Sequence, residues 1–300
     1  MDLPEEKQVK SGIVALVGPP NVGKSTLLNT LLGQKISIVS PKPQTTRNKI
    51  LGIVNGDDFQ IVMIDTPGIH AARSPLNLEM VRIAVESLAE VDVIVFMIDT
   101  SFPVPGKISA ATEHLKNTGK PVILLLNKVD LVSPQTLLPI LDAYKNLYPF
   151  TAMIPISALK QDGTDLLLDE LLRLLPMGPR LYPEDIPTDA TERFIAAEII
   201  REKIFLLTTQ EIPYSCAVMV DSFREEEKKI TIDATIYVER KSQKGIIIGK
   251  QGSMLKQIGQ TARQDLKELL GINVVLKLWV RVQEDWSRDE RFLRELGFGG

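Results

Sequence analysis

The residues with the clearest chemical meaning lie near the N-terminus, in the run Gly-Pro-Pro-Asn-Val-Gly-Lys-Ser-Thr at 18–26. This run follows an apolar stretch at 13–17, precedes a helix-like stretch at 26–32, and fits the pattern G-x-x-x-x-G-K-[ST]. The two glycines let successive backbone N–H groups point into one concavity, which fits a polyphosphate. We therefore predict a phosphate-binding loop formed by Gly18, Asn21, Val22, Gly23, Lys24, Ser25 and Thr26.

The side chains at the end of this loop suit a nucleotide with its metal ion. Lys24 can reach the β and γ phosphates, and Ser25 can offer its hydroxyl to Mg²⁺. The dipole of the following helix adds partial positive charge behind the loop. The motif predicts a nucleotide but does not identify the base.

The base is indicated about a hundred residues later. The apolar run 121–126 reads as a buried strand that ends in Asn127-Lys-Val-Asp130. The Asp130 carboxylate can accept from N1–H and the exocyclic amine of guanine, whereas adenine lacks both donors. We expect Asn127 to tie this loop to the phosphate loop and the Lys128 stem to lie on the base. Further on, Ser157 and Ala158 follow another apolar run, and a small residue there lets a backbone N–H approach the guanine O6.

A third motif should sense the γ phosphate. The apolar run 59–64 ends in Asp-Thr-Pro-Gly, where Asp65 can hold Mg²⁺ through water and the Gly68 N–H can bond a γ-phosphate oxygen. Upstream lies a long polar loop, 34–48, from which one threonine should complete the Mg²⁺ shell. Thr46 is favoured over Thr45, so the predicted metal residues are Ser25, Thr46 and Asp65. The predicted switch residues are Gln44, Thr45, Thr46, Arg47, Asp65, Thr66, Pro67, Gly68 and Ile69.

Ile69 stands where many GTPases carry a glutamine that orients the attacking water. Hydrolysis should therefore be slow unless another group positions the water, and slow hydrolysis suits a timer. Arg47 and His70 are nearby candidates, although both have an ordinary interpretation as solvated loop residues. Asn21, together with a folded 34–48 loop, could hold a K⁺ ion where other systems place an arginine.

Length and composition favour two domains that fold around their own cores. The chain has 300 residues, 44% of them apolar and 24% charged, and no apolar run reaches the length of a membrane span. Residues 1–10 are polar and of mixed charge, unlike a signal peptide. The only cysteine, Cys216, lies in an apolar run and reads as a buried strand thiol in a reducing compartment. Two histidines and one cysteine provide no cluster of metal ligands beyond the Mg²⁺ site.

The first part of the chain alternates strands with helices. Helical patterns are expected near 75–89, 107–117, 134–147 and 165–174, separated by apolar runs at 93–98, 121–126 and from 151. Alternation of this kind predicts an α/β fold, a doubly wound and mostly parallel sheet with helices on both faces. We expect a polar tail at 1–10, a GTPase domain at 11–176, a proline-rich linker at 177–189 and a second domain at 190–300.

The second domain has an α+β pattern and a basic stretch. A helix is expected at 190–206, strands at 214–223 and 229–239, a helix at 253–270 and a strand at 273–282. Although the block from 181 onward is nearly neutral, 238–281 carries nine basic residues against three acidic ones. That basic stretch coincides with a glycine-punctuated run, Gly-Ile-Ile-Ile-Gly-Lys-Gln-Gly, at 245–252.

A Gly-x-x-Gly turn between two helices beside a small sheet is how KH modules clamp about four nucleotides of a single strand. The glycines let the sugar-phosphate backbone approach, Lys250 can meet a phosphate, and the side of the 246–248 run can form an apolar floor for bases. The alternative is a solvated basic face on a protein-docking domain. The predicted RNA-binding residues are Lys244, Gly245, Ile246, Ile248, Gly249, Lys250, Gln251, Gly252 and Lys256.

Taken in order, the motifs at 18–26, 44–47, 65–68, 127–130, 157–158, 239–252 and 278–280 resemble the Era family of bacterial ribosome-assembly GTPases. The resemblance covers nearly the whole chain and implies a type II KH domain. It also implies binding of GTP and GDP, binding of the 3′ end of 16S rRNA, a role in maturation of the 30S subunit, and a cytoplasmic protein sometimes found loosely at the inner membrane. Members also lack the glutamine that Ile69 replaces.

The chain departs from the family pattern at two positions. Pro19 stands where an arginine is common, and Gln251 where a glycine is common in the clamp. Pro19 should matter little for GTP binding. Gln251 puts a side chain into the loop that is expected to contact RNA, so it should weaken or reshape that contact.

Together the motifs predict a GTP-gated RNA clamp: Thr46 and Gly68 engage the γ phosphate and order the switch loops, which exposes the 249–252 face to RNA, and hydrolysis releases the RNA. Two other functions compete with this hypothesis. The amphipathic tail 286–296 would suit a signalling or membrane-recruited GTPase whose C-terminal domain docks protein or lipid, although packing onto the KH domain also explains it. The second competing function is a protein that binds GTP without hydrolysing it, because Ile69 replaces the glutamine that orients the attacking water. We expect a monomer in each case.

Overall fold

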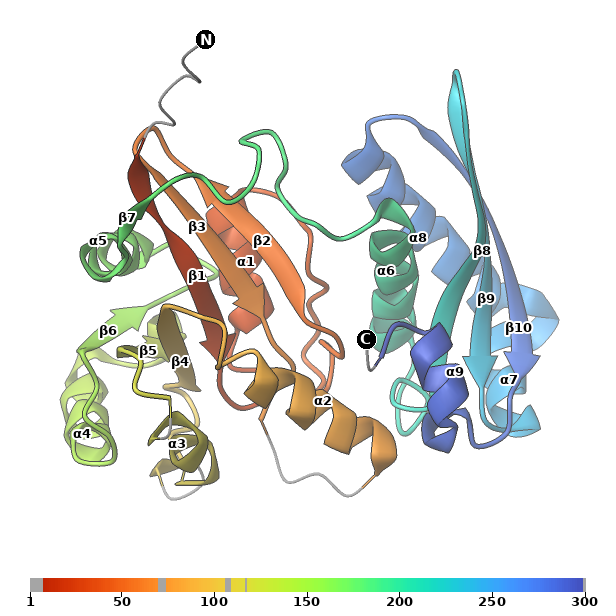
Figure 1. The fold of residues 1–300 in the computed structure, drawn as a ribbon. Coiled ribbons are helices and arrows are strands. Elements are labelled where there is room, and N and C mark those ends of the chain that lie inside the picture. The colour runs from red at the N-terminus through yellow and green to blue at the C-terminus, as the bar shows by residue number, and fades with distance from the viewer. Residues whose placement is uncertain (1–7, 70–73, 106–108, 117, 299–300) are drawn as a thin grey trace, which may run out of the picture. The chain divides into compact units, whose positions relative to one another are not determined.

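The computed structural model describes residues 8–69, 74–105, 109–116 and 118–298, and the chain divides into two units (Figure 1). We call 1–37, 46–72 and 80–189 the N-terminal unit. The remaining segments, 38–45, 73–79 and 190–300, form the C-terminal unit. Two short pieces of the expected GTPase domain therefore cluster with the residues of the expected KH domain.

The N-terminal unit is built on a seven-stranded sheet with the strand order β2-β3-β1-β4-β5-β6, and β7 pairs with β1. All neighbours on this path are parallel except β2 with β3, and β7 is antiparallel to β1. The expected mostly parallel α/β sheet is confirmed. The strands are β1 (Val9–Val17), β2 (Ile50–Asn55), β3 (Phe59–Asp65), β4 (Val93–Asp99), β5 (Val122–Asn127), β6 (Ala152–Ile156) and β7 (Met177–Gly178).

Helices follow the strands as the alternating pattern predicts. Strands β4 and β5 are continuous apolar runs buried along nearly their whole length, as expected where helices cover a parallel sheet. Because every parallel strand ends at the same edge, the loops after β1, β3, β5 and β6 gather there. The helices in this part of the chain are α1 (Lys24–Leu32), α2 (Pro75–Glu86), α3 (Ser109–Lys116), α4 (Pro134–Lys145) and α5 (Thr164–Leu174), with a 3₁₀ turn at Val129–Leu131.

The segment expected as a linker, 177–189, is hydrogen-bonded to the N-terminal unit. Its first two residues form β7, Pro187 accepts from the Ile53 N–H at 2.9 Å, and Thr188 Oγ1 donates to the Leu51 carbonyl at 2.6 Å. These bonds satisfy backbone groups on the outer edge of β2, a strand that the apolar pattern did not reveal.

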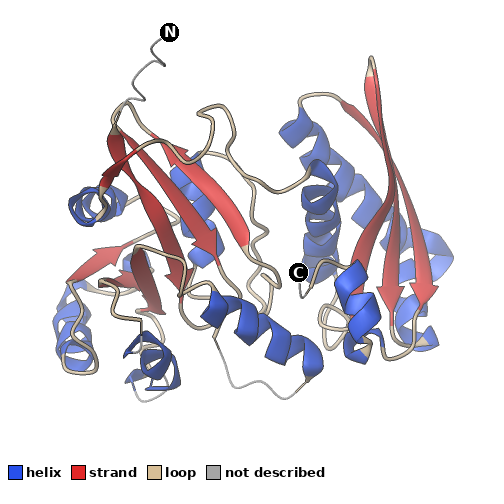
Figure 2. Ribbon diagram, in the orientation of Figure 1, coloured by secondary structure: helices blue, strands red, loops and turns tan. Residues whose placement is uncertain are grey.

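The C-terminal unit has a three-stranded sheet in the order β10-β9-β8, shown as arrows in Figure 2. Strand β9 is parallel to β10 and antiparallel to β8, whose register shifts between Val220 and Ser222. The elements are α6 (Glu192–Leu207), β8 (Cys216–Glu226), β9 (Lys229–Val238), α7 (Lys241–Ile248), α8 (Ser253–Leu270), β10 (Asn273–Val282) and α9 (Glu290–Glu295), with 3₁₀ turns at Lys250–Gly252 and Trp286–Arg288.

Helices α6, α7 and α8 pack on this sheet around an apolar core. Along β10 the side chains alternate, with Val274 and Val280 buried and Val275 and Trp279 exposed, so one face of the strand meets the helices. Cys216 is buried in the same core. The tail also packs on this unit, because the indole of Trp286 is fully buried and its Nε1 donates to the Ser215 carbonyl at 3.0 Å.

Candidate GTP site and nucleic-acid groove

The phosphate loop joins β1 to α1 and requires glycine at both of its motif positions. Gly18 has φ +147°, and a Cβ there would lie 2.3 Å from the Met97 carbonyl oxygen. Gly23 has φ +104°, and a Cβ would lie 2.2 Å from Nδ2 of Asn127. Asn21, between them, is exposed with φ 64°. Only glycine combines this backbone geometry with such close neighbours.

Lys24 begins α1 and lies over the loop. Its Nζ donates to the carbonyls of Gly18 at 3.2 Å and Pro19 at 3.1 Å, and the side chain is buried. Burial lowers the pKa of Lys24 to about 8, and the charge of Asp65 opposes that shift. Val22 is also buried, and Thr26 lies in the first turn of the helix.

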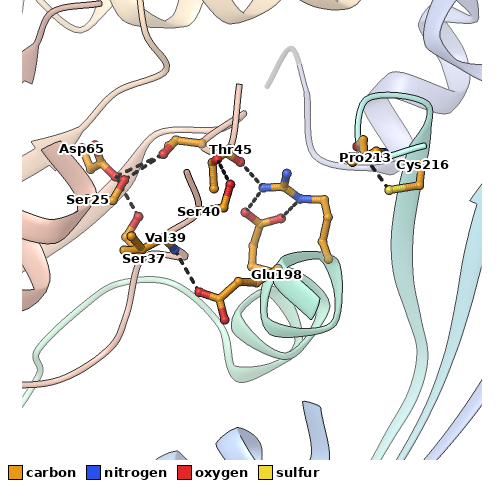
Figure 3. Close-up of polar contacts among 12 residues, drawn as sticks. Ser25, Ser37, Val39, Ser40, Thr45, Asp65, Glu198, Pro213 and Cys216 are labelled. Atoms are coloured by element: carbon orange, nitrogen blue, oxygen red, sulfur yellow. Dashed lines mark hydrogen bonds and ion pairs between the residues drawn. The ribbon is translucent and has the colours of Figure 1, made fainter. Parts of the chain in front are cut away.

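Four oxygen-bearing side chains converge at Asp65, which lies near Lys24, and Figure 3 shows the hydrogen bonds among them. Oδ2 of Asp65 accepts from Ser25 Oγ at 2.6 Å and from Ser37 Oγ at 2.7 Å. The hydroxyls of Ser25 and Thr46 lie 2.9 Å apart. Oδ1 of Asp65 is buried and has no hydrogen-bond partner within the described part of the chain. Burial raises the pKa of Asp65, although Lys24 and the three hydroxyls act in the opposite direction.

The two adjacent threonines of the polar loop have different surroundings. Thr45 Oγ1 donates to the Lys42 carbonyl at 2.7 Å and lies 2.8 Å from Ser40 Oγ, whereas Thr46 Oγ1 lies beside Ser25 and Asp65. The structure therefore brings Thr46, and not Thr45, to the predicted metal residues. Gln44 precedes them with φ 60°, and Arg47 is buried.

The loops after β5 and β6 are held against the phosphate loop by Asn127. Its Nδ2 donates to the Val22 carbonyl at 2.7 Å, and its Oδ1 accepts from the Ala158 N–H at 2.9 Å. Ser157 Oγ donates to Asp130 Oδ1 at 2.6 Å. Five residues predicted to contact guanine and phosphate, drawn from three loops, thus form one connected network.

Sequence reasoning missed Asp99, which ends β4 next to this network. Lys128 adopts φ 68°, and its Nζ donates to Asp99 Oδ2 at 2.5 Å. Burial raises the pKa of Asp99, but hydrogen bonds from Lys128 and Ser101 outweigh burial and lower it overall. The sequence offered one signal for Asp99, namely a carboxylate at the end of an apolar run. Asp65 has the same signal.

The loop after β3 packs tightly under the phosphate loop. Thr66 Oγ1 donates to the Leu16 carbonyl at 2.7 Å, and Pro67 is buried. A Cβ at Gly68 would lie 2.6 Å from the backbone nitrogen of Pro20, so the loop cannot carry a side chain there. Ile69 donates its N–H to the Gly18 carbonyl at 3.1 Å, and its side chain is buried in the apolar core. His70 lies outside the described residues.

In the C-terminal unit, the Gly-x-x-Gly turn joins α7 to α8. Gly249 has φ 72°, and a Cβ there would lie 2.7 Å from Met254 Cβ, whereas Gly252 has φ 78° and open space around it. Lys250 and Gln251 between them are exposed, and Gln251 itself has φ 52°. Four predicted RNA-binding residues lie in α7 itself, and Lys256 lies in α8; those in α7 are Lys244, Gly245, Ile246 and Ile248.

A groove of about 440 Å³ runs from this turn between α8 and β10. The sequence led us to expect an apolar floor for bases on the side of the 246–248 run, and these residues are not among those that line the groove. Ile246 is 46% exposed on α7 and does not line it. The lining residues are Gly252, Leu255, Lys256, Gly259, Gln260, Arg263, Leu276 and Leu278. Two patterns in the sequence could have identified them. Leu276 and Leu278 lie two residues apart on one face of β10, and the lining residues of α8 recur every three to four residues on one face of that helix.

Among the described residues, no helix is both long enough and apolar enough to cross a membrane.

Comparisons with known proteins identify the type of both domains. Residues 13–128 match the family model described as a 50S ribosome-binding GTPase, and residues 211–287 match the KH domain model. Two solved structures of Era each superpose with a TM-score of 0.93 at 45% identity, over 96% of this chain and 99% of theirs. One is a variant from Aquifex aeolicus bound to GDP and AlF₄⁻, and the other is a complex with MgGDPNP and nucleotides 1506–1542 of 16S ribosomal RNA.

Curated relatives cover almost the whole chain. The GTPase Era of Syntrophus aciditrophicus is 53% identical over 96% of this chain and 95% of its own length. The GTPase Era of Geotalea uraniireducens is 52% identical over 98% of this chain and 99% of its own length. The two domain types, their order and this degree of identity lead to one conclusion: the chain belongs to the Era family of GTPases.

Proposed function

We propose that this GTPase binds GTP between the phosphate loop and the loops after β5 and β6, and hydrolyses it to GDP and phosphate. The hydrogen bonds of Asn127 to Val22 and Ala158 carry this proposal, because they hold the base-reading loops and the phosphate loop in one frame. Asp130, fixed by Ser157, would accept from N1–H and the amine of guanine. Lys24 would exchange its bonds to loop carbonyls for bonds to the β and γ phosphates.

The oxygen cluster fits Mg²⁺. Hydroxyl and carboxylate oxygens are the ligands that this hard cation prefers, and Asp65 Oδ1 is a buried acceptor without a partner among the described residues. Ser25 and Thr46 would bind the ion directly and Asp65 through water. When bound, the ion would supply positive charge that stabilises negative charge on the phosphates during hydrolysis.

Slow hydrolysis is proposed because the side chain at the usual position of the water-orienting glutamine is turned away. Ile69 is buried in the core of the N-terminal unit. Asn21, exposed at the rim of the phosphate loop, is our candidate for holding a K⁺ ion beside the phosphates.

The K⁺ proposal predicts that hydrolysis is several-fold faster in K⁺ than in Na⁺ at equal ionic strength. Asn21→Gly should remove that difference, because glycine keeps the positive φ and lacks the amide oxygen. Single-turnover GTP hydrolysis in the two salts measures this directly. Equal rates in both salts for the unmodified chain would refute a role for K⁺.

We propose that the C-terminal unit binds the single-stranded 3′ end of 16S rRNA and that the protein acts in 30S subunit maturation. The related complex with nucleotides 1506–1542 supports the choice of RNA. The Gly249–Gly252 turn would admit the sugar-phosphate backbone, and the apolar floor beside Leu276 and Leu278 would accept bases. Lys250, Lys256 and Arg263 would supply the positive charge.

The test is the affinity of the whole chain for this RNA with a GTP analogue and with GDP. Gly249→Asp with Gly252→Asp should abolish binding, because both substitutions put a carboxylate beside the phosphates. Gly271→Asp at the far end of α8 is the control, since it has a similar φ of 66° and open space. Binding that falls steeply with added salt would support phosphate contacts. Unimpaired binding by the double variant would rule out the turn as the RNA site.

The tail offers little support for protein or lipid docking as the main function. Trp286 is fully buried, and Phe292 packs edge-on against Tyr237 with ring centroids 5.0 Å apart. The apolar side chains that would anchor a membrane or a partner are therefore used within the C-terminal unit. We propose that the protein works as a monomer in the cytoplasm, and that any contact with the membrane is peripheral.

A further inference from the structure

Ser37, near the start of the polar loop, contacts the metal residues although it was not predicted to be one of them. Its hydroxyl donates to Asp65 Oδ2 at 2.7 Å, the same oxygen that accepts from Ser25 Oγ at 2.6 Å. Figure 3 shows both serines bonded to Asp65. All three residues lie in the N-terminal unit, so these bonds are internal to that unit.

The two serines use one oxygen of the carboxylate and leave the other available. Asp65 Oδ1 is buried and has no hydrogen-bond partner in the part of the chain that the structure describes. The last torsion of an aspartate has a broad preference, so hydrogen bonds, rather than a rotamer, set the plane of its carboxylate. The direction in which Oδ1 points therefore depends on the donors that hold Oδ2.

Asn29 places Ser37 through three hydrogen bonds to the backbone. Its Oδ1 accepts from the N–H groups of Ile36 and Ser37, both at 2.9 Å, and its Nδ2 donates to the Ser37 carbonyl at 2.7 Å. Both backbone groups of Ser37 are thus satisfied by one side chain. Ile36 is buried next to it in the sequence. None of these bonds uses a residue that is proposed to bind phosphate or metal.

Helix α1 therefore holds the carboxylate at the end of β3 by two routes. Ser25 and Asn29 are four residues apart on α1, so they lie on the same face of the helix. Ser25 donates to Asp65 directly, whereas Asn29 acts through Ser37. Ser25 is also a proposed ligand of Mg²⁺, but Ser37 is not, so the bond from Ser37 serves the carboxylate alone.

Burial makes the bond from Ser37 hard to replace. Ser37 and Asp65 are both 0% exposed. Bulk water does not reach either side chain, so a carboxylate that lost this donor would have no solvent molecule to take its place, and a buried acceptor without a donor is unfavourable. The bond is thus expected to persist whether or not nucleotide is bound.

We infer that Ser37, placed by Asn29, is a positioning residue for the metal: it fixes the plane of the Asp65 carboxylate so that Oδ1 meets a water molecule on Mg²⁺. This inference rests on the proposed GTP and Mg²⁺ site. Without the Ser37 hydroxyl, Oδ1 would point toward that water for only part of the time, and the ion would bind more weakly. Because the ion and the nucleotide bind to the same site, the loss appears as a weaker dependence of nucleotide affinity on Mg²⁺.

The experiment measures the affinity of the whole chain for GDP in EDTA and over a series of Mg²⁺ concentrations. The quantity compared is the half-effect concentration, the Mg²⁺ concentration that gives half of the full increase in GDP affinity. Ser37→Ala removes the hydroxyl and keeps the backbone that Asn29 binds. We expect it to raise the half-effect concentration at least threefold and to leave GDP affinity in EDTA unchanged, because Asp65 is proposed to act only through the ion. Asn29→Ala should also raise the half-effect concentration, since it releases the backbone of Ser37.

Ser11→Ala is the matched control. Ser11 is also a buried serine of the N-terminal unit, and its hydroxyl has no hydrogen-bond partner among the described residues. This variant should keep the half-effect concentration of the unmodified chain.

Two results would overturn the inference while the GTP site stands. Ser37→Ala could keep the unmodified half-effect concentration, or it could weaken GDP binding in EDTA as much as in Mg²⁺, which would show general damage to the site. An unmodified chain that binds GDP equally well with and without Mg²⁺ would instead overturn the proposed metal site. Failure of the unmodified chain to bind GDP at all would overturn the GTP site, and in both cases this inference would fall with it.

Discussion

At the scale of single residues, the GTP site depends on side chains that each serve two purposes. Asn127, which we propose lies next to the base, joins two loops, and Lys128, whose stem we propose lies on the base, donates to Asp99. Ser157 donates to Asp130, so the carboxylate proposed to read the base is already held in place without nucleotide. Polar groups that are already held in place discriminate strongly between guanine and other bases, because a different base leaves them without hydrogen-bond partners.

Asp130→Asn should change which base is preferred. The amide can still accept from N1–H, but its NH₂ group would face the guanine amine, and two donors cannot pair. We expect GDP affinity to fall on the order of a hundredfold, since an unpaired buried polar group costs about 1–3 kcal/mol. Xanthosine diphosphate carries a carbonyl at that position and should gain affinity.

Titration calorimetry with the two diphosphates measures both changes. Asp142→Asn is the matched control, because that carboxylate is exposed on α4 and pairs only locally with Lys145 among the described residues. If Asp130→Asn binds GDP as tightly as the unmodified chain, the carboxylate does not read the base.

At the scale of elements, the most informative departure from expectation is the segment 177–189. Arg180 donates to the carbonyls of Gly56 at 2.8 Å and Phe59 at 2.9 Å, in the turn between β2 and β3. The backbone N–H groups of Leu181 and Tyr182 both donate to Gln60, at 2.6 and 2.9 Å. A proline-rich sequence that has no periodic pattern is therefore an ordered strap along the edge of the sheet.

Arg180→Met should destabilise the N-terminal unit. The substitution keeps most of the stem and leaves two carbonyls without their charged donor, and hydrogen bonds to charged groups contribute about 1.5–3 kcal/mol each. We expect a loss of about 1–3 kcal/mol in the free energy of unfolding, measured with urea by circular dichroism. Arg173→Met, whose side chain is 78% exposed beside Glu170, is the control and should change stability little. Equal stability of both variants would contradict an ordered strap.

At the scale of the whole molecule, the described residues divide into two units, each with its own apolar core. The phosphate and guanine loops lie wholly within the N-terminal unit, whereas the groove, the Gly249–Gly252 turn and the tail lie within the C-terminal unit. The proposed nucleotide site and the proposed RNA site thus belong to units with separate cores.

Trp286→Ala should damage the second unit selectively. Removing a fully buried indole and its bond to Ser215 typically costs about 3–5 kcal/mol, so the C-terminal unit should unfold at lower urea concentration and RNA affinity should fall. GDP affinity should be retained, because none of its predicted contacts lies in that unit. Trp279→Ala is the matched control, since Trp279 is 47% exposed on β10. Parallel loss of GDP affinity would show that the two units fold as one.

The sequence by itself determined the fold class, the nucleotide loops and the KH module, because these depend on local rules. A phosphate loop needs glycines within a few residues, and buried parallel strands need continuous apolar runs, so both are written in short stretches. Only the tertiary structure showed that Thr46, and not Thr45, lies beside Ser25 and Asp65. It also revealed strand β2, the contact of Asp99 with Lys128, and a groove between α8 and β10. Those features depend on residues far apart in the chain. Contacts such as Arg201 with Thr45, separated by 156 positions, leave no periodic signal for the sequence to carry.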